Sequence, residues 1–198
     1  DSTFFNLIPD SSKGIKLLNS KEYLTCIITN QPVIARGDCS LDELSFIHKK
    51  METLLGKEGA YIDRIYFCPH HPDSGFDNEV KKLKINCECR KPNIGMLTKA
   101  VLDLNINLNG SWFIGDTTTD ILTAKKAGIK SVLVETGMAG LDYKYLVYPD
   151  FICSNLHNAA KFITNDYELI YNYCRKLINA IGNRKIIKIG GESKSEKN

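Results

Sequence analysis

The sequence of 198 residues has no long apolar run. Stretches such as 24–29 and 131–134 are far shorter than the roughly 18 to 20 residues of a membrane-spanning helix. The first residues also lack the basic and apolar regions of a signal peptide. We therefore expect a cytoplasmic protein that has no membrane partner.

A strong excess of charge is missing as well. Lys and Arg number 26 and Asp and Glu number 23, which leaves a net charge of +3. The basic residues are scattered apart from short pairs, so no nucleic-acid partner is expected. With 43% hydrophobic and 25% charged residues, the composition is ordinary for a globular domain and excludes a disordered or repetitive chain.

The cysteines do not form an even set. There are seven, and without an export signal reduced thiols are expected rather than disulfides. Four of them stand singly in the sequence, where cysteine is usually a small buried apolar residue. The other three, Cys68, Cys87 and Cys89, lie near His70 and indicate a different role.

These three thiols and the imidazole match a tetrahedral zinc site. One residue separates Cys68 from His70, and one residue separates Cys87 from Cys89. A closed set of four ligands predicts a structural zinc that holds the long loop 69–92 in place. The alternative is two chance pairs. His71 is a less favoured ligand, because His70 gives both pairs the same spacing.

Strands alternate with helices along the chain. Strands are expected at 23–29, 62–68, 112–115, 130–135 and 151–153, and helices at 10–19, 95–104, 120–127 and 155–163, with a further helix after Ser40. This order predicts an α/β fold with a Rossmann-like, mostly parallel sheet flanked by helices. Ligands bind beyond the carboxyl ends of such strands.

Residues 165–198 differ from this pattern. We expect a domain at 1–164 and a C-terminal extension that holds a helix at 167–181 and a strand-like run at 185–189. The end of the chain resembles the start of a P-loop, broken at Glu196 and Asn198. A fused kinase or transferase domain is one reading, and a polar terminus is the other.

Polar residues follow two of the expected strands. Asp116 and Asp120 can hold Mg²⁺, or can simply cap a helix. Arg90 and Lys91 suit a phosphate group, and Thr29 with its two neighbours adds hydrogen-bond donors. Alternatively, Arg90 and Lys91 are simply solvated charges, and Thr29 and its neighbours form an ordinary turn. Together the pieces describe a phosphoryl-transfer site for a small phosphorylated substrate.

The combined motifs resemble the haloacid dehalogenase superfamily. They are Thr29-Asn-Gln-Pro-Val-Ile-Ala-Arg-Gly37, Cys68-Pro-His-His-Pro72, Cys87-Glu-Cys-Arg-Lys-Pro92 and Ile114-Gly-Asp-Thr-Thr-Thr-Asp120. Within it, the zinc loop is similar to that of the D-glycero-D-manno-heptose 1,7-bisphosphate phosphatases and their histidinol-phosphatase relatives. The resemblance covers roughly residues 4–163.

The resemblance implies a Mg²⁺-dependent phosphatase that works through an aspartyl-phosphate. The implied roles are phosphoryl binding for Thr29 and Lys91, Mg²⁺ binding for Asp116, substrate binding for Asn30, Gln31 and Arg90, and zinc binding for Cys68, His70, Cys87 and Cys89. Many relatives have Lys where this chain has Thr117.

The family's Asp-x-Asp motif, which supplies the nucleophile and the acid/base, is absent from the 198 residues. The only early acids, Asp1 and Asp10, do not follow an apolar strand. We therefore expect a fragment that lacks a central strand, hydrolyses nothing alone and has low stability. The alternatives are a histidinol-phosphate phosphatase and a non-catalytic, phosphate-binding zinc domain.

Overall fold

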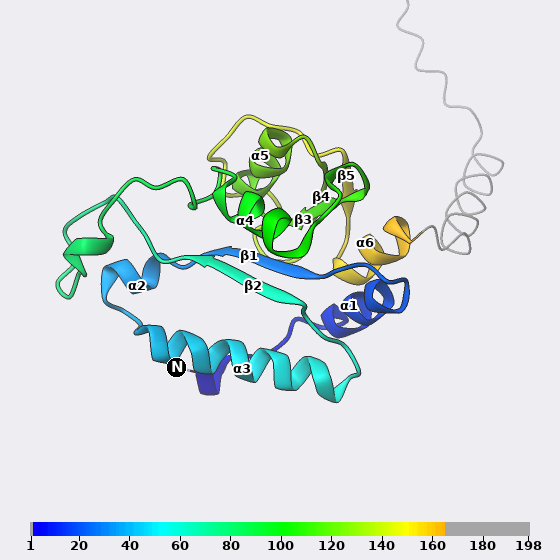
Figure 1. Ribbon diagram of the computed structural model, residues 1–198, viewed down its shortest axis with the longest axis horizontal. Helices are drawn as coiled ribbons and strands as arrows, with labels where there is room; N and C mark the ends of the chain where they lie inside the picture. The colour runs from blue at the N-terminus through cyan, green and yellow to red at the C-terminus, as the bar shows by residue number, and fades with distance from the viewer. Residues whose placement is uncertain (1, 165–198) are drawn as a thin grey trace, which may run out of the picture. The chain divides into compact units, whose positions relative to one another are not determined.

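The computed structural model describes residues 2–164, in which strands and helices alternate (Figure 1). The elements are η1 (Ser2–Phe4), α1 (Ser11–Ser20), β1 (Cys26–Asn30), α2 (Pro32–Arg36), α3 (Leu41–Lys57), β2 (Arg64–Cys68), η2 (Lys81–Leu83), α4 (Gly95–Leu104), η3 (Leu108–Gly110), β3 (Trp112–Gly115), α5 (Thr118–Ala127), β4 (Lys130–Val134), β5 (Phe151–Cys153) and α6 (Leu156–Ile163). The long segment between β2 and α4 holds only the short η2.

Every strand pairing among these residues is parallel, which confirms the expected α/β class. The single sheet that the sequence led us to expect is divided into two, however. One sheet has the order β1-β2 and the other the order β3-β4-β5. Within residues 2–164, β1 and β3 each have one edge with no strand partner.

Helices cover both sheets. On one side of β1 and β2, Met96 and Ala100 of α4 pack with Tyr66 and Cys68. α3 lies along the same pair of strands (Figure 1), and its His48 ring meets Phe67 of β2 edge-on at 5.8 Å.

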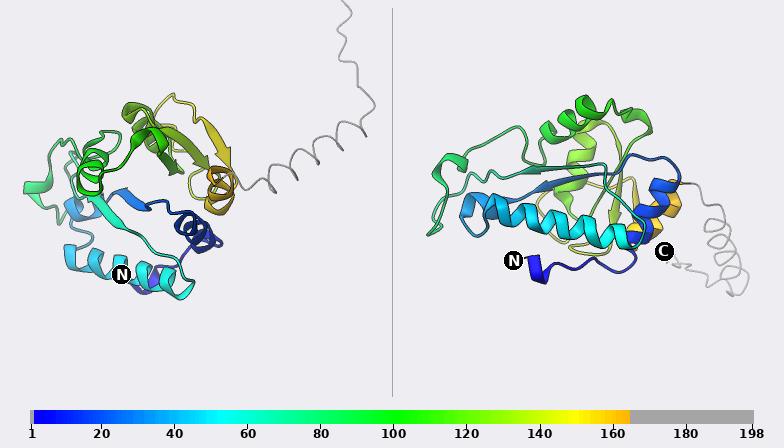
Figure 2. Two further views of the ribbon diagram at one scale, coloured as in Figure 1. Left: turned by 45° about the vertical axis from the view of Figure 1, so that its right-hand side comes forward. Right: turned by 60° about the horizontal axis from the view of Figure 1, so that its bottom comes forward.

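The other sheet is covered by α5 and by α6, and α6 also lies beside α1 (Figure 2). Val132 and Val134 of β4 pack with Ala159 of α6 and Leu18 of α1 in one apolar cluster. The first helix of the chain is thus packed against the last described one.

Local sequence signals explain several helix boundaries. Ser40 and Glu43 form a complete capping box at the start of α3, as the sequence predicts. Thr117 and Asp120 form a second box, so α5 begins at Thr118, two residues before the expected start. The five-residue helix α2 was not expected, because 32–36 follows the strand directly and is too short for a periodic pattern.

The expected helix at 167–181, the expected strand at 185–189 and the P-loop-like end lie outside the described residues. Within residues 2–164, no helix has the length and apolar character needed to cross a membrane.

Candidate functional site

Four side chains from β2 and the following loop converge on one point. The ligand atoms of Cys68, His70, Cys87 and Cys89 all lie within 4.8 Å of one another. The sulfur–sulfur distances are 3.2 to 3.5 Å, and His70 Nδ1 lies 3.3 Å from Cys89 Sγ. A tetrahedral zinc about 2.3 Å from each sulfur would set the sulfurs about 3.8 Å apart, so the cluster could hold such an ion.

The acid–base state of these thiols also suits a cation. Burial raises the pKa of Cys68 well above its usual value, and burial likewise raises the pKa of Cys89. At Cys87 burial acts in the same direction, but hydrogen bonds from the thiols of Cys89 and Cys68 bring its pKa below the usual value. The protein alone thus favours ionisation of Cys87 and opposes ionisation of Cys68 and Cys89, and the positive charge of a metal ion would favour the thiolate form of all three.

His71 lies outside this group of four. Its buried ring has Nε2 3.2 Å from Arg36 Nη2 and lies edge-on to Phe76. Arg36 Cζ is also 4.9 Å from the Phe76 ring centroid. His71 thus connects the loop between β2 and α4 to α2.

Asn30, at the end of β1, holds the backbone of Lys91. Its Nδ2 donates to the Lys91 carbonyl at 3.0 Å, and its Oδ1 accepts from the Lys91 N–H at 2.9 Å. This pair of bonds fixes the loop of Lys91 against the first sheet. The sequence predicts a substrate role for Asn30. Its amide instead bonds to the backbone of Lys91, and the residue also lines a cavity.

The Lys91 ammonium group lies between the two sheets. It donates to Asp120 Oδ1 at 2.5 Å and to the carbonyl of Ile28 in β1 at 2.8 Å. Asp120 accepts further bonds from Thr117, so it serves as a cap and as an ion-pair partner rather than facing a metal. A Cβ at Gly115 would collide with the Asp120 side chain, which explains the glycine before Asp116.

The remaining predicted residues lie at the same ends of the strands. Asp116 Oδ2 accepts from the backbone N–H of Met138 at 2.8 Å, and its other carboxylate oxygen has no bond within residues 2–164. Thr29 Oγ1 accepts from Gln31 Nε2 at 3.1 Å. Arg90 donates to the His70 carbonyl at 3.1 Å, which joins the two ends of the loop between β2 and α4.

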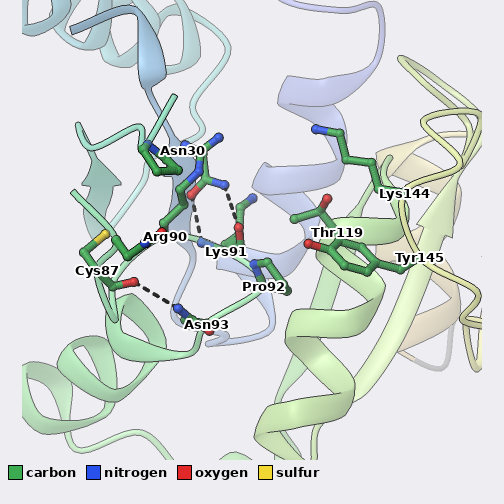
Figure 3. A pocket seen from close by; sticks show the side chains of 11 residues that line it. Asn30, Cys87, Arg90, Lys91, Pro92, Asn93, Thr119, Lys144 and Tyr145 are labelled. Carbon is green, nitrogen blue, oxygen red and sulfur yellow. Dashed lines mark hydrogen bonds between the residues drawn. The ribbon is translucent and has the colours of Figure 1, made fainter. Parts of the chain in front are cut away.

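A cavity of about 270 Å³ opens beside Lys91 (Figure 3). It is lined by Asn30, Pro72, Asn86, Cys87, Arg90, Lys91, Pro92, Asn93, Thr119, Lys144 and Tyr145. Within the described part of the chain, this lining has three cationic side chains and no carboxylate. Asn30, Lys91 and Arg90 thus share one cavity, whereas Thr29, Gln31 and Asp116 are not part of its lining.

Sequence reasoning missed Lys144 and Tyr145. They stand on the loop between β4 and β5, which carries no motif that predicts a site. Asp142 positions this loop by accepting bonds from the N–H and the hydroxyl of Thr118, at 2.7 and 2.8 Å, and the same hydroxyl accepts from the N–H of Tyr145. Only the fold brings these residues to the cavity.

Parallel strands, a lysine–aspartate pair at their carboxyl ends and a cation-lined cavity suit an enzyme that acts on a phosphorylated substrate. A family model described as HAD-hydrolase-like matches residues 88–159. The chain also superposes on a D,D-heptose 1,7-bisphosphate phosphatase from B. bronchiseptica complexed with magnesium and phosphate. That match has a TM-score of 0.72 and 29% identity, and it covers 84% of this chain and 88% of the other.

Two curated proteins are similar to this chain over most of its length. The D-glycero-beta-D-manno-heptose-1,7-bisphosphate 7-phosphatase of Haemophilus ducreyi is 39% identical over 137 residues, which are 68% of this chain and 72% of the relative. The D-glycero-D-manno-heptose-1,7-bisphosphate 7-phosphatase of Thermosynechococcus vestitus is 34% identical over 164 residues, 79% of this chain and 82% of the relative. The chain belongs to this heptose-bisphosphate phosphatase family of HAD-like hydrolases, as the motifs predicted.

Proposed function

We propose that the protein is a sugar-phosphate phosphatase of the D-glycero-D-manno-heptose 1,7-bisphosphate type. The observation that carries this proposal is the cavity beside Lys91, which combines three cations with no carboxylate in its described lining. Such a cavity favours a ligand with several negative charges. A sugar bisphosphate supplies them and leaves its hydroxyl groups to Asn86, Asn93 and Thr119.

The same charge pattern argues against histidinol phosphate. That ligand carries an ammonium group, which Arg90 and Lys144 would repel, because within residues 2–164 only Lys91 of the three cations has a carboxylate partner. We therefore favour the sugar bisphosphate over the histidinol-phosphate alternative.

Two metal ions belong to the proposal. Zinc would be held by Cys68, His70, Cys87 and Cys89 and would be structural, because all four positions are filled by protein ligands. Mg²⁺ would take the uncommitted oxygen of Asp116. Among the named residues this is a single carboxylate, so Mg²⁺ would bind together with the substrate phosphate and water. Bound Mg²⁺ would neutralise phosphate charge.

We infer distinct tasks for Lys91, which lines the cavity, and for Thr29, which lies near the carboxyl end of β1 and outside that lining. The Lys91 ammonium offsets the charge of the transferring phosphoryl group, and the hydroxyl of Thr29 donates to one of its oxygens. The nucleophile of this chemistry is an aspartate of an Asp-x-Asp pair, which the 198 residues do not contain. The proposed activity therefore requires that pair to be supplied.

The test uses the 198-residue chain with the heptose 1,7-bisphosphate. Titration calorimetry should detect binding, and a phosphate-release assay should detect no turnover. A second protein carries an added upstream strand that ends in Asp-x-Asp, and its matched control carries Asn-x-Asn instead. We expect release of the 7-phosphate only from the protein with Asp-x-Asp.

Each result decides between the alternatives. Turnover by the 198 residues alone would contradict the stated need for Asp-x-Asp. Binding that never leads to turnover, even with the added strand, would favour the non-catalytic phosphate-binding domain. Tighter binding of histidinol phosphate than of the bisphosphate would overturn the choice of substrate.

A further inference from the structure

The two walls of the cavity differ in whether their polar side chains form hydrogen bonds with other protein groups. On one wall, Asn30, Lys91 and Arg90 all bond to protein groups. On the other wall stand Thr119, Lys144 and Tyr145 (Figure 3). Within residues 2–164 the Lys144 amine makes no hydrogen bond or ion pair. Of the three cations of the cavity, Lys91 is thus paired with Asp120, Arg90 uses one donor on a backbone carbonyl, and Lys144 on the opposite wall has no protein partner in the described part of the chain.

The backbone beneath Lys144 is nevertheless held firmly. Asp142 accepts two bonds from Thr118 at the start of α5, and the Tyr145 N–H donates to the Thr118 hydroxyl at 3.2 Å. These bonds lie on both sides of Lys144 in sequence. The loop thus presents a free amine from a fixed backbone, which lowers the entropic cost of binding an anion there.

A bisphosphate carries two anionic groups, and one cavity must hold both. The group that is transferred goes to Lys91, as the proposed function states. The second group needs a cation at a distance from Lys91, and the opposite wall offers one.

We propose, on the basis of that function, that Lys144 binds the phosphate group that is not transferred. Tyr145 lines the same wall and covers the sugar between the two phosphates. Lys144 is then a specificity-determining residue that distinguishes a bisphosphate from a monophosphate. It does not touch the reacting atoms.

The experiment measures binding to the 198-residue chain by calorimetry, with heptose 1,7-bisphosphate and heptose 7-phosphate as the two probes. The variants are K144Q and K144R, and K126Q is the matched control on the exposed side of α5. We expect K144Q to weaken bisphosphate binding about 10- to 100-fold, the range for a charge-assisted contact. Binding of the 7-phosphate should change less than about twofold, K144R should retain most of the affinity, and K126Q should have no effect.

Two results would overturn this inference alone. One is that K144Q weakens both probes equally or neither of them, and the other is that the unaltered chain binds the two probes with the same affinity. If the unaltered chain binds no bisphosphate, the proposed function and this inference fail together. Lys144 is exposed, so its variants test binding rather than folding.

Discussion

At the scale of single residues, the Lys91–Asp120 ion pair deserves a direct test. Only 12% of the lysine side chain and 7% of the aspartate side chain are exposed. Asp120→Asn keeps the helix cap but leaves the ammonium group without its counter-charge. We expect the free energy of unfolding to fall by about 3–5 kcal/mol, because breaking a buried pair leaves a charge uncompensated.

Urea unfolding of the variant and of a control measures this loss. The control is Lys13→Gln, which breaks the exposed pair of Lys13 with Asp10. Exposed pairs contribute little to stability, so the control should leave the unfolding midpoint almost unchanged. Equal effects of the two substitutions would mean that the Lys91–Asp120 pair is not the buried contact described above.

Sequence reasoning named Asn30, Arg90 and Lys91, which the structure brings to one cavity, but it did not name their partners. Lys91 follows directly from its motif, and the placement of Asn30 at a strand end follows from the strand pattern. The Asn30 amide bonds to the backbone of Lys91, which lies 61 positions further along the chain, and no local pattern predicts that contact. Lys144 could not be found, because its loop is brought to the cavity by Asp142 and no local pattern encodes that approach.

At the scale of elements, the loop between β2 and α4 should depend on zinc. It contains one three-residue helix and carries three of the four ligands, so a bound ion would replace the core that it lacks. Chelation of the metal, or Cys89→Ser, should remove about 3 kcal/mol of stability. For a domain of this size that lowers the melting temperature by roughly 6–12 °C.

Metal content and thermal unfolding test this expectation together. We expect one zinc per chain, lost in Cys89→Ser and retained in Cys39→Ser, whose cysteine lies outside the cluster. Limited proteolysis of the metal-free protein should cut within 69–94. The structural role of zinc would be refuted if the protein bound no zinc, or if chelation left its melting temperature unchanged.

Several elements could be predicted from sequence because their signals are local. The helix α4 and the strands β3 and β5 have the expected bounds, and the capping box of α3 is present. The sequence predicts the start of α5 two residues too late, because Thr117 and Asp120 complete a capping box and the helix therefore begins at Thr118.

At the scale of the whole described unit, the division into two sheets could not be read from the chain. Alternation of strands and helices predicts parallel strands but does not say which strands are neighbours. β1 pairs only with β2, and β3 only with β4, within residues 2–164. The 198 residues contain no Asp-x-Asp pair, and within the described residues β1, β2, β3 and β5 each have an edge without a strand partner.

The unpaired edge of β1 gives the last prediction. Gln31 N–H donates to the Cys68 carbonyl in β2, and backbone groups point to alternate sides along a strand. Thr29 therefore also faces β2, whereas Ile28 and Asn30 face away, where the Ile28 carbonyl accepts from Lys91. We expect the amides of Ile28 and Asn30 to exchange hydrogen at least about tenfold faster than those of Thr29 and Gln31.

Hydrogen exchange followed by NMR measures all four amides in one sample. The protein with the added Asp-x-Asp strand is the informative comparison, because pairing on that edge should slow Ile28 and Asn30 and leave Thr29 and Gln31 little changed. Equal protection of all four amides in the 198-residue chain would mean that the edge is already covered. The added strand would then have no free edge of β1 to pair with.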